Sequence, residues 1–169
     1  MKYISITLLC AAVVLTGLNA AAERRKRIRI FERLSVLFAS LAADIKKGSC
    51  GFLILLGDMA RQERFGMFTF IPDTLLSAAN GDDIALSWQN AVNADKMLSR
   101  TGNDNIRAVR ELSLCFCEAA PAVFADACFD LSRRFENERE RSVKKSEKDE
   151  RLLIAGSVLG AAALCIILI

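Results

Sequence analysis

Both ends of the chain are apolar and uncharged, and this feature constrains the fold more than any other. Tyr3–Ala22 has no charged side chain over 20 residues, and Leu152–Ile169 has none over 18. As helices, at about 1.5 Å per residue, these segments reach roughly 30 and 27 Å, close to the hydrocarbon thickness of a bilayer. We therefore predict an N-terminal transmembrane helix over residues 1–22 and a C-terminal one over residues 152–169.

The middle of the chain is charged and nearly neutral overall. Residues 23–151 hold all 20 acidic residues and 22 of the 23 basic ones. A segment of this length is large enough to bury a hydrophobic core of its own. We expect a single domain here, held between the two membrane helices.

The junction after the first apolar segment has two interpretations. Ala20–Ala22 fits the small-residue cleavage site of a signal peptide, which would leave a secreted protein. Against cleavage, a dense basic block follows at once, and a second basic cluster precedes the C-terminal segment. We predict that the anchor is retained, with both termini outside and the central domain in the cytoplasm. The predicted membrane-flanking basic residues are Arg24, Arg25, Lys26, Arg27, Arg29, Lys144, Lys145, Lys148 and Arg151.

Apolar residues in the middle recur at helical rather than strand spacing. They fall three or four residues apart along the segment that follows the first basic cluster, and only two prolines occur in the whole chain. The sequence predicts an all-α fold, a helical bundle between two membrane helices. The predicted core residues are Phe31, Leu34, Leu41, Ile45, Trp88 and Val92.

Small residues suggest how the two membrane helices pack. Gly156 and Gly160 lie four residues apart in the second apolar segment, and Gly17 lies in the first. Small residues at this spacing let two helices approach closely in lipid. We expect these glycines to pack the two spans into a hairpin.

The residue types argue against catalysis. The chain has no histidine, which excludes His-based acid–base chemistry and most transition-metal sites. Cys115 and Cys117 are two residues apart, so on one helix they point in different directions and cannot share a metal ion. We expect buried, reduced thiols, no cofactor and no metal, with a thiol oxidoreductase using these two cysteines as the enzyme alternative. Outside Glu23–Arg29 the domain has no excess of positive charge, so we also expect no nucleic-acid partner.

Three features are candidates for partner contact or for a buried polar role. The segment 133–151 mixes charges of both signs on one helix, which is typical of a solvated face, and we place a partner contact there or on the turn 61–65. Asp95 is expected at a helix edge, with a buried polar pin or a partner contact as the alternatives.

These features together resemble the stage III sporulation protein AB family of endospore-forming bacteria. An N-terminal span runs into the basic helix "RRKRIRIFERLSVLFASLAADIKKG", with Asp44-Ile45 followed by Gly48. A tryptophan helix, "NGDDIALSWQNAV", follows a glycine turn, and "KKSEKDERLLIAGSVLGAAALCIILI" leads into a terminal span. The resemblance covers essentially the whole chain.

The resemblance implies a scaffold. The family's cytoplasmic part is similar to the helical domain of type II secretion and type IV pilus platform proteins. It implies a mother-cell complex at the membrane around the forespore, in which this protein docks a secretion-type ATPase similar to stage III sporulation protein AA. The chain itself has no phosphate-binding loop of the G-x-x-x-x-G-K-[ST] type, so ATP would be hydrolysed by the partner. The alternative is a membrane-bound regulator or sensor that couples to a soluble partner through the charged last helix.

Overall fold

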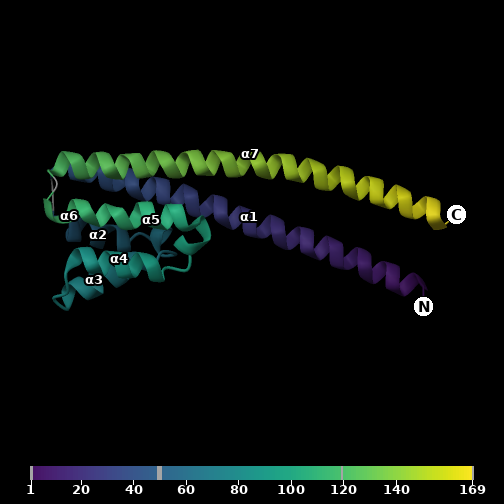
Figure 1. Ribbon diagram of the computed structural model, residues 1–169, viewed down its shortest axis with the longest axis horizontal. Helices are drawn as coiled ribbons and strands as arrows, with labels where there is room; N and C mark the ends of the chain where they lie inside the picture. The colour runs from purple at the N-terminus through teal and green to yellow at the C-terminus, as the bar shows by residue number, and fades with distance from the viewer. Residues whose placement is uncertain (1, 49–50, 119, 169) are drawn as a thin grey trace. The chain divides into compact units, whose positions relative to one another are not determined.

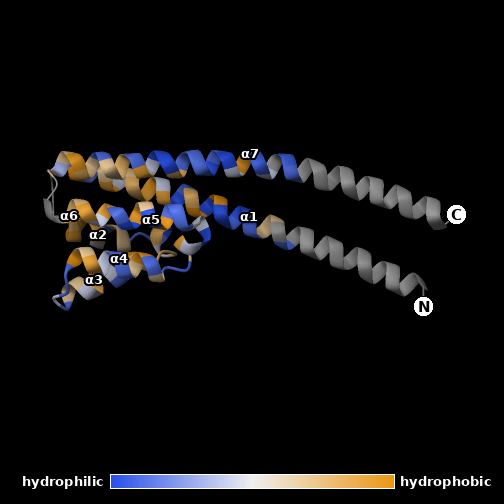
Figure 2. Cartoon of the chain, in the orientation of Figure 1, coloured by the Kyte–Doolittle hydropathy of each residue, from blue (hydrophilic) through white to orange (hydrophobic). Residues whose placement is uncertain are grey.

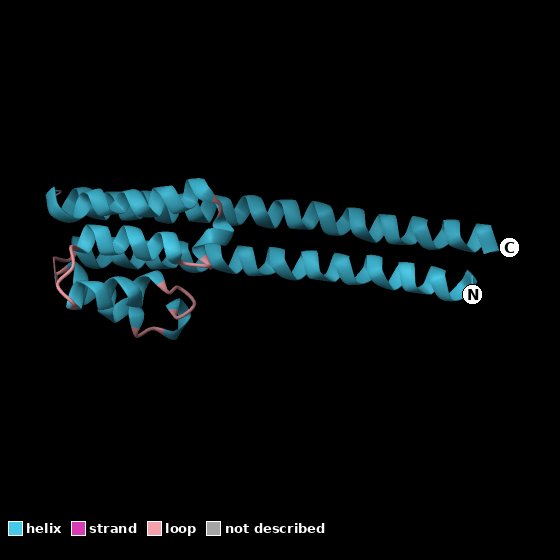
Figure 3. Ribbon diagram, turned by 60° about the horizontal axis from the view of Figure 1, so that its bottom comes forward, coloured by secondary structure: helices cyan, strands magenta, loops and turns pink. Residues whose placement is uncertain are grey.

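The chain folds into helices joined by short loops (Figures 1 and 3). The computed structural model describes the backbone of residues 2–48, 51–118 and 120–168, and side chains chiefly within 21–48, 51–116 and 120–149. No strand occurs among these residues, so the predicted all-α class is confirmed. The α-helices are α1 (Lys2–Lys46), α2 (Phe52–Ala60), α3 (Phe70–Ala79), α4 (Ile84–Ala94), α5 (Asn103–Glu111), α6 (Cys115–Glu118) and α7 (Pro121–Leu168), and the 3₁₀ turns are η1 (Glu63–Phe65), η2 (Leu98–Thr101) and η3 (Leu112–Leu114).

The chain divides into two compact units. One consists of residues 29–139, which we call the core unit, and the other consists of residues 1–28 and 140–169, which we call the paired-helix unit. The long helices α1 and α7 each contribute to both units. Each unit is described separately below.

In the core unit, α1 and α7 pack side by side and antiparallel. Phe135 of α7 stacks on Phe38 and Phe31 of α1, with ring centroids 5.7 and 6.3 Å apart. Further along, Lys46 of α1 pairs with Asp126 of α7 at 3.0 Å. Because the contacts run from the middle of α1 against later residues of α7 to the end of α1 against earlier ones, the two helices run in opposite directions.

The shorter helices pack their aromatic residues against one another. Trp88 of α4 is fully buried and makes edge-to-face contacts with Phe52, Phe70 and Phe116. Its indole N–H donates to the backbone carbonyl of Val109 at 2.8 Å. This bond satisfies the one polar atom of the ring, so burying the whole side chain leaves no uncompensated donor.

Local signals explain where several helices begin and end. Asp83 caps the N-terminus of α4 by accepting from the Leu86 amide at 2.8 Å, as a short acidic side chain at this position commonly does. Gly81 has φ +92°, a left-handed conformation that suits glycine, and it forms the turn between α3 and α4. Helix α4 stops at Ala94, because Asp95 adopts an extended conformation.

The predicted core residues differ in how deeply their side chains are buried. Five of them are buried, whereas Ile45 is partly exposed and packs against the margin of the core. The five buried residues are Phe31, Leu34, Leu41, Trp88 and Val92.

The sequence interpretation missed part of the core that α7 contributes. It treated the charged stretch from Arg133 onward as solvated, yet Phe135 within that stretch is fully buried. Phe135 continues a seam of buried residues at three- and four-residue steps from Phe124 through Cys128 and Leu131. The flanking charges hid a single aromatic residue that lies on the core-facing side of the helix.

Candidate docking surface

The buried carboxylate of Asp95 fixes the base of the α3–α4 hairpin. One carboxylate oxygen accepts from the Phe70 amide at the start of α3 at 3.0 Å, and the other accepts from the amides of Met97 and Leu98 at 2.7 and 2.8 Å. The side chain is almost completely buried, so the expected helix-edge position was wrong and the polar pin is what the structure shows. Asp95 therefore joins the start of α3 to the segment that follows α4.

The charged half of α7 satisfies many of its charges locally. Arg139 donates to Glu136 at 2.6 Å within the core unit, and Lys144 lies 3.9 Å from Glu140 in the paired-helix unit. Pairs three or four residues apart support an exposed helix but contribute little free energy each. Charges that are already paired are less free to recognise a partner.

The 61–65 turn, the other predicted contact place, is also engaged within the chain. Arg64 donates to the Gln62 side chain at 2.8 Å and lies over the Phe65 ring, 4.6 Å from its centroid. Phe65 itself is buried. The turn therefore packs onto the core unit, with Arg64 held against it.

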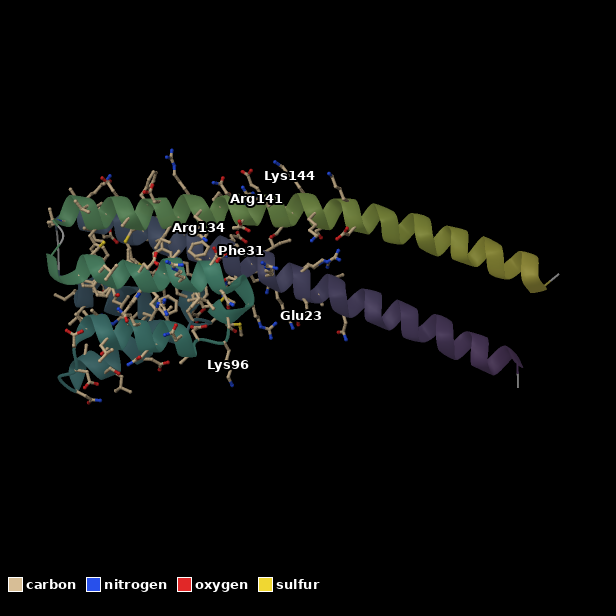
Figure 4. The ribbon with its side chains drawn as sticks, viewed as in Figure 1. Glu23, Phe31, Lys96, Arg134, Arg141 and Lys144 are labelled. Atoms are coloured by element: carbon tan, nitrogen blue, oxygen red, sulfur yellow. The ribbon has the colours of Figure 1, made fainter. Side chains whose placement is uncertain are left out.

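An open groove of about 310 Å³ lies between α5, η3 and α6 on one side and α7 on the other. Its apolar lining is formed by small and aliphatic side chains, and its polar lining by Glu111 on one wall and Asp130 and Arg134 on the other. Arg134 reaches from α7 toward α5 (Figure 4), where its Nε donates to Asn105 at 3.0 Å. The apolar lining residues are Ala108, Leu112, Cys115, Ala127 and Leu131.

The two cysteines whose side chains are described are free thiols with different accessibility. Cys115 is partly exposed and lines the groove, whereas Cys128 is fully buried in the core. Burial, and secondarily the neighbouring Cys115, raise the pKa of Cys128 to about 12. The Cys128 thiol is therefore neutral at physiological pH and poorly suited to nucleophilic chemistry. Cys117, the other half of the enzyme alternative, has no described side chain.

No candidate metal site is present in the described part of the chain, since no three potential ligands among His, Cys, Asp and Glu come together there. The groove carboxylates Glu111 and Asp130 lie on different elements and have no third acidic neighbour in the lining.

The paired-helix unit brings the two predicted basic clusters together. Arg24 of α1 forms an ion pair with Asp149 of α7 at 2.8 Å, so the segment after the first apolar stretch lies beside the segment before the second. Lys26 pairs with Glu23 at 3.1 Å. The residues of these clusters that are exposed are Arg25, Lys26, Arg27, Arg29, Lys144, Lys145 and Lys148, while Arg24 is partly buried.

The predicted spans fall almost wholly outside the residues whose side chains are described. The side chain of Arg151 and the predicted packing glycines Gly17, Gly156 and Gly160 also lie outside the described side chains. Within the described part of the chain, no helix is both long enough and apolar enough to cross a membrane. The two spans, and the topology built on them, remain predictions from the sequence.

Comparison with known proteins identifies the family. The model of the stage III sporulation protein AB family matches residues 2–169. No curated protein and no solved structure matches the chain. Because the family match extends over nearly every residue, the chain belongs to the stage III sporulation protein AB family, which supports a role in stage III of spore formation.

Proposed function

We propose that this protein is a membrane-anchored, non-catalytic platform of a secretion-like sporulation complex, which docks a cytoplasmic secretion-type ATPase in the mother cell. The observation that carries the proposal is the family match over residues 2–169 together with the layout of the chain. The core unit includes parts of both long helices, and α1 begins with an apolar segment without charge while α7 includes another near its C-terminal end. Such a layout suits a protein that holds partners at a membrane.

Two further observations support a scaffold. The sequence lacks a phosphate-binding loop and histidine, so the chemistry of ATP hydrolysis would belong to the partner. The Arg24–Asp149 pair holds α1 and α7 together next to both apolar segments, at the level where the proposal puts the cytoplasmic surface of the membrane. The basic residues there favour the cytoplasmic side.

Co-purification from sporulating cells tests the docking role. We expect the tagged full-length chain, extracted in mild detergent, to recover a secretion-type ATPase and other membrane proteins of the same complex. A strain that lacks the gene is expected to fail at stage III. Recovery of neither class of protein, or normal spores from the deletion strain, would contradict the platform.

Reporter fusions test the topology separately. A reporter that is active only outside the cytoplasm, fused after Ile169, should be active, and the same reporter inserted near residue 100 should be silent. The opposite pattern would overturn the orientation. The neighbouring genes give an independent test. A neighbouring gene for a kinase or a transcription factor, with no ATPase gene nearby, would favour the alternative of a membrane-bound regulator.

A further inference from the structure

The two units of the chain carry net charges of opposite sign. The paired-helix unit has ten basic and five acidic residues, whereas the core unit has 13 basic and 15 acidic ones. The paired-helix unit also contains both uncharged apolar segments, Tyr3–Ala22 and Leu152–Ile169. Apart from Lys2, its basic residues lie in 24–27 and 141–151, next to those segments. The excess positive charge of the protein is therefore gathered beside the two predicted spans.

On α7 these positive charges share one exposed side of the helix. Among the described side chains from residue 141 to residue 149, all the exposed ones are basic, whereas Ser142, Ser146 and Asp149 are partly buried. These three lie three or four residues apart and so share a side of the helix, which Asp149 turns toward Arg24 of α1 at 2.8 Å. The exposed residues, which we call the basic stripe, are Arg141, Lys144, Lys145 and Lys148.

The described acidic side chains leave much of this charge uncompensated. Asp149 is engaged by Arg24, and Glu140 lies 3.9 Å from Lys144, at the outer limit of an ion pair. Lys145 and Lys148 form no ion pair with any described side chain, and the same is true of the exposed Arg25 on α1. Both helices therefore present cationic groups that are open to a ligand from outside the chain.

These cationic groups lie close to the ends of the apolar segments. Lys148 and Lys145 precede Leu152 by four and seven residues, which is about 6 and 10 Å along a helix. Arg25 follows Ala22 by three residues, about 5 Å. Lipid head groups occupy roughly the outermost 5–8 Å of each leaflet, and long basic side chains extend their charged ends into this layer. If the segments cross the bilayer as proposed, these three residues reach the head groups.

We propose that the basic stripe of α7, together with Arg25 of α1, binds the phosphate groups of anionic phospholipids in the cytoplasmic leaflet. The proposal rests on the membrane anchoring in the proposed function and adds the class of lipid that surrounds the anchor. Charge complementarity selects this occupant, because an anionic phospholipid has no positive group of its own to offset its phosphate. Both helices continue directly into apolar segments, so a bilayer is the surface that lies beside these charges.

The residues of the stripe should contribute unequally. Each lysine or arginine near an anionic surface strengthens binding by about fivefold, and this attraction fades over a Debye length of about 8 Å at physiological salt. Lys148 and Lys145 lie within or close to that distance from the apolar segment, whereas Arg141 lies about 16 Å from it. We therefore expect Lys145 and Lys148 to dominate the contribution of α7.

The lipid preference of the full-length chain in bilayer vesicles tests this surface. The vesicles contain equal amounts of phosphatidylglycerol and phosphatidylcholine, and a trace of one or the other has a spin label on its acyl chain. Electron paramagnetic resonance then measures how much of each lipid the protein holds. We expect a preference for phosphatidylglycerol of about tenfold or more, and Lys145→Gln combined with Lys148→Gln should lower it by at least about fivefold.

Two matched variants show whether position and charge are responsible. Lys47→Gln combined with Lys96→Gln removes the same charge from exposed lysines of the core unit and should leave the preference unchanged. Lys145→Arg combined with Lys148→Arg keeps both charges in place and should also retain it. Raising the salt concentration from about 0.1 to 1 M should weaken the preference, because the Debye length falls from about 10 to 3 Å. Loss of the preference in either matched variant would contradict the assignment to the stripe.

The outcomes separate this proposal from the proposed function. If alkaline carbonate washes the unmodified chain off the vesicles, the membrane anchoring fails and the lipid surface fails with it. If the chain stays in the membrane but holds both lipids equally, the lipid proposal alone is wrong. It is also wrong if the glutamine variant keeps the full preference, because the stripe is then not the surface that binds the lipid.

Discussion

The two halves of α7 differ although they belong to one continuous helix. From Phe124 to Phe135 the helix presents a buried seam to the core unit. From residue 136 to residue 149 none of the described side chains is buried, and polar residues dominate (Figure 2). The first half is held by packing, whereas the second is supported by helix propensity and by pairs such as Glu136–Arg139. A continuous helix therefore does not imply a continuous core.

The strongest test of this contrast removes one aromatic ring. Phe135→Ala deletes a fully buried side chain that stacks on Phe31 and Phe38, and we expect a loss of about 3–5 kcal/mol in the free energy of unfolding. Asn137→Ala, two residues later on an exposed position, should change it by less than about 0.5 kcal/mol. Chemical denaturation of the full-length chain in micelles, followed by circular dichroism, measures both. Equal effects would show that α7 has no such division.

A smaller but still large effect is expected at Asp95. Asp95→Ala leaves the amides of Phe70, Met97 and Leu98 without their side-chain acceptor, and we expect a loss of about 2–3 kcal/mol. Asp82→Ala removes an exposed carboxylate from the same hairpin and should be nearly neutral. The same denaturation experiment compares the two variants. A neutral Asp95→Ala would mean that water replaces the carboxylate easily.

Two glycines allow the effect of backbone conformation on stability to be measured without an effect of side-chain packing. Gly81 has φ +92° and Gly57 lies within α2, and an added Cβ would meet nothing within 4 Å at either position. Gly81→Ala should cost about 1–2 kcal/mol, because an L-residue is strained there. Gly57→Ala should be neutral or stabilising by up to about 1 kcal/mol, because alanine favours the helix. Thermal unfolding curves distinguish the two signs.

The smallest effect is expected in the paired-helix unit. Arg24 and Asp149 are both partly exposed, so a double-mutant cycle with Arg24→Ala and Asp149→Ala should give a coupling of less than about 1 kcal/mol. Raising the salt concentration should reduce this coupling further. A coupling of several kcal/mol would show that the pair is shielded from solvent and that the charged half of α7 is stabilised as strongly as the seam.

Much of the fold could be predicted from the sequence, because helical periodicity is local. The apolar face of α1 and the cap at Asp83 follow from spacing and residue type alone. Phe135 was missed because the charged residues on both sides of it hid that it continues the spacing of Phe124, Cys128 and Leu131. Asp95 was misplaced because its acceptor role depends on Phe70, which lies 25 residues away in the sequence.

The groove could not be predicted from the sequence for the same reason. Its walls come from α5 and α7, and nothing in the spacing of Glu111 and Asp130 indicates that they face a common space. The polar residues that line it are ordinary surface residues by type. Only the packing of α5 and α7 brings them to the lining of one groove.

The closed base of the α3–α4 hairpin has a practical consequence for following the protein in cells. Because Asp95 ties the start of α3 to the residues after α4, the hairpin does not depend on its turn alone to keep its two helices together. The turn at Asn80–Asp82 is exposed and lies far along the chain from the groove residues. A short epitope or fluorophore-binding tag inserted at this turn should therefore report the protein's position during spore development while leaving the rest of the molecule intact.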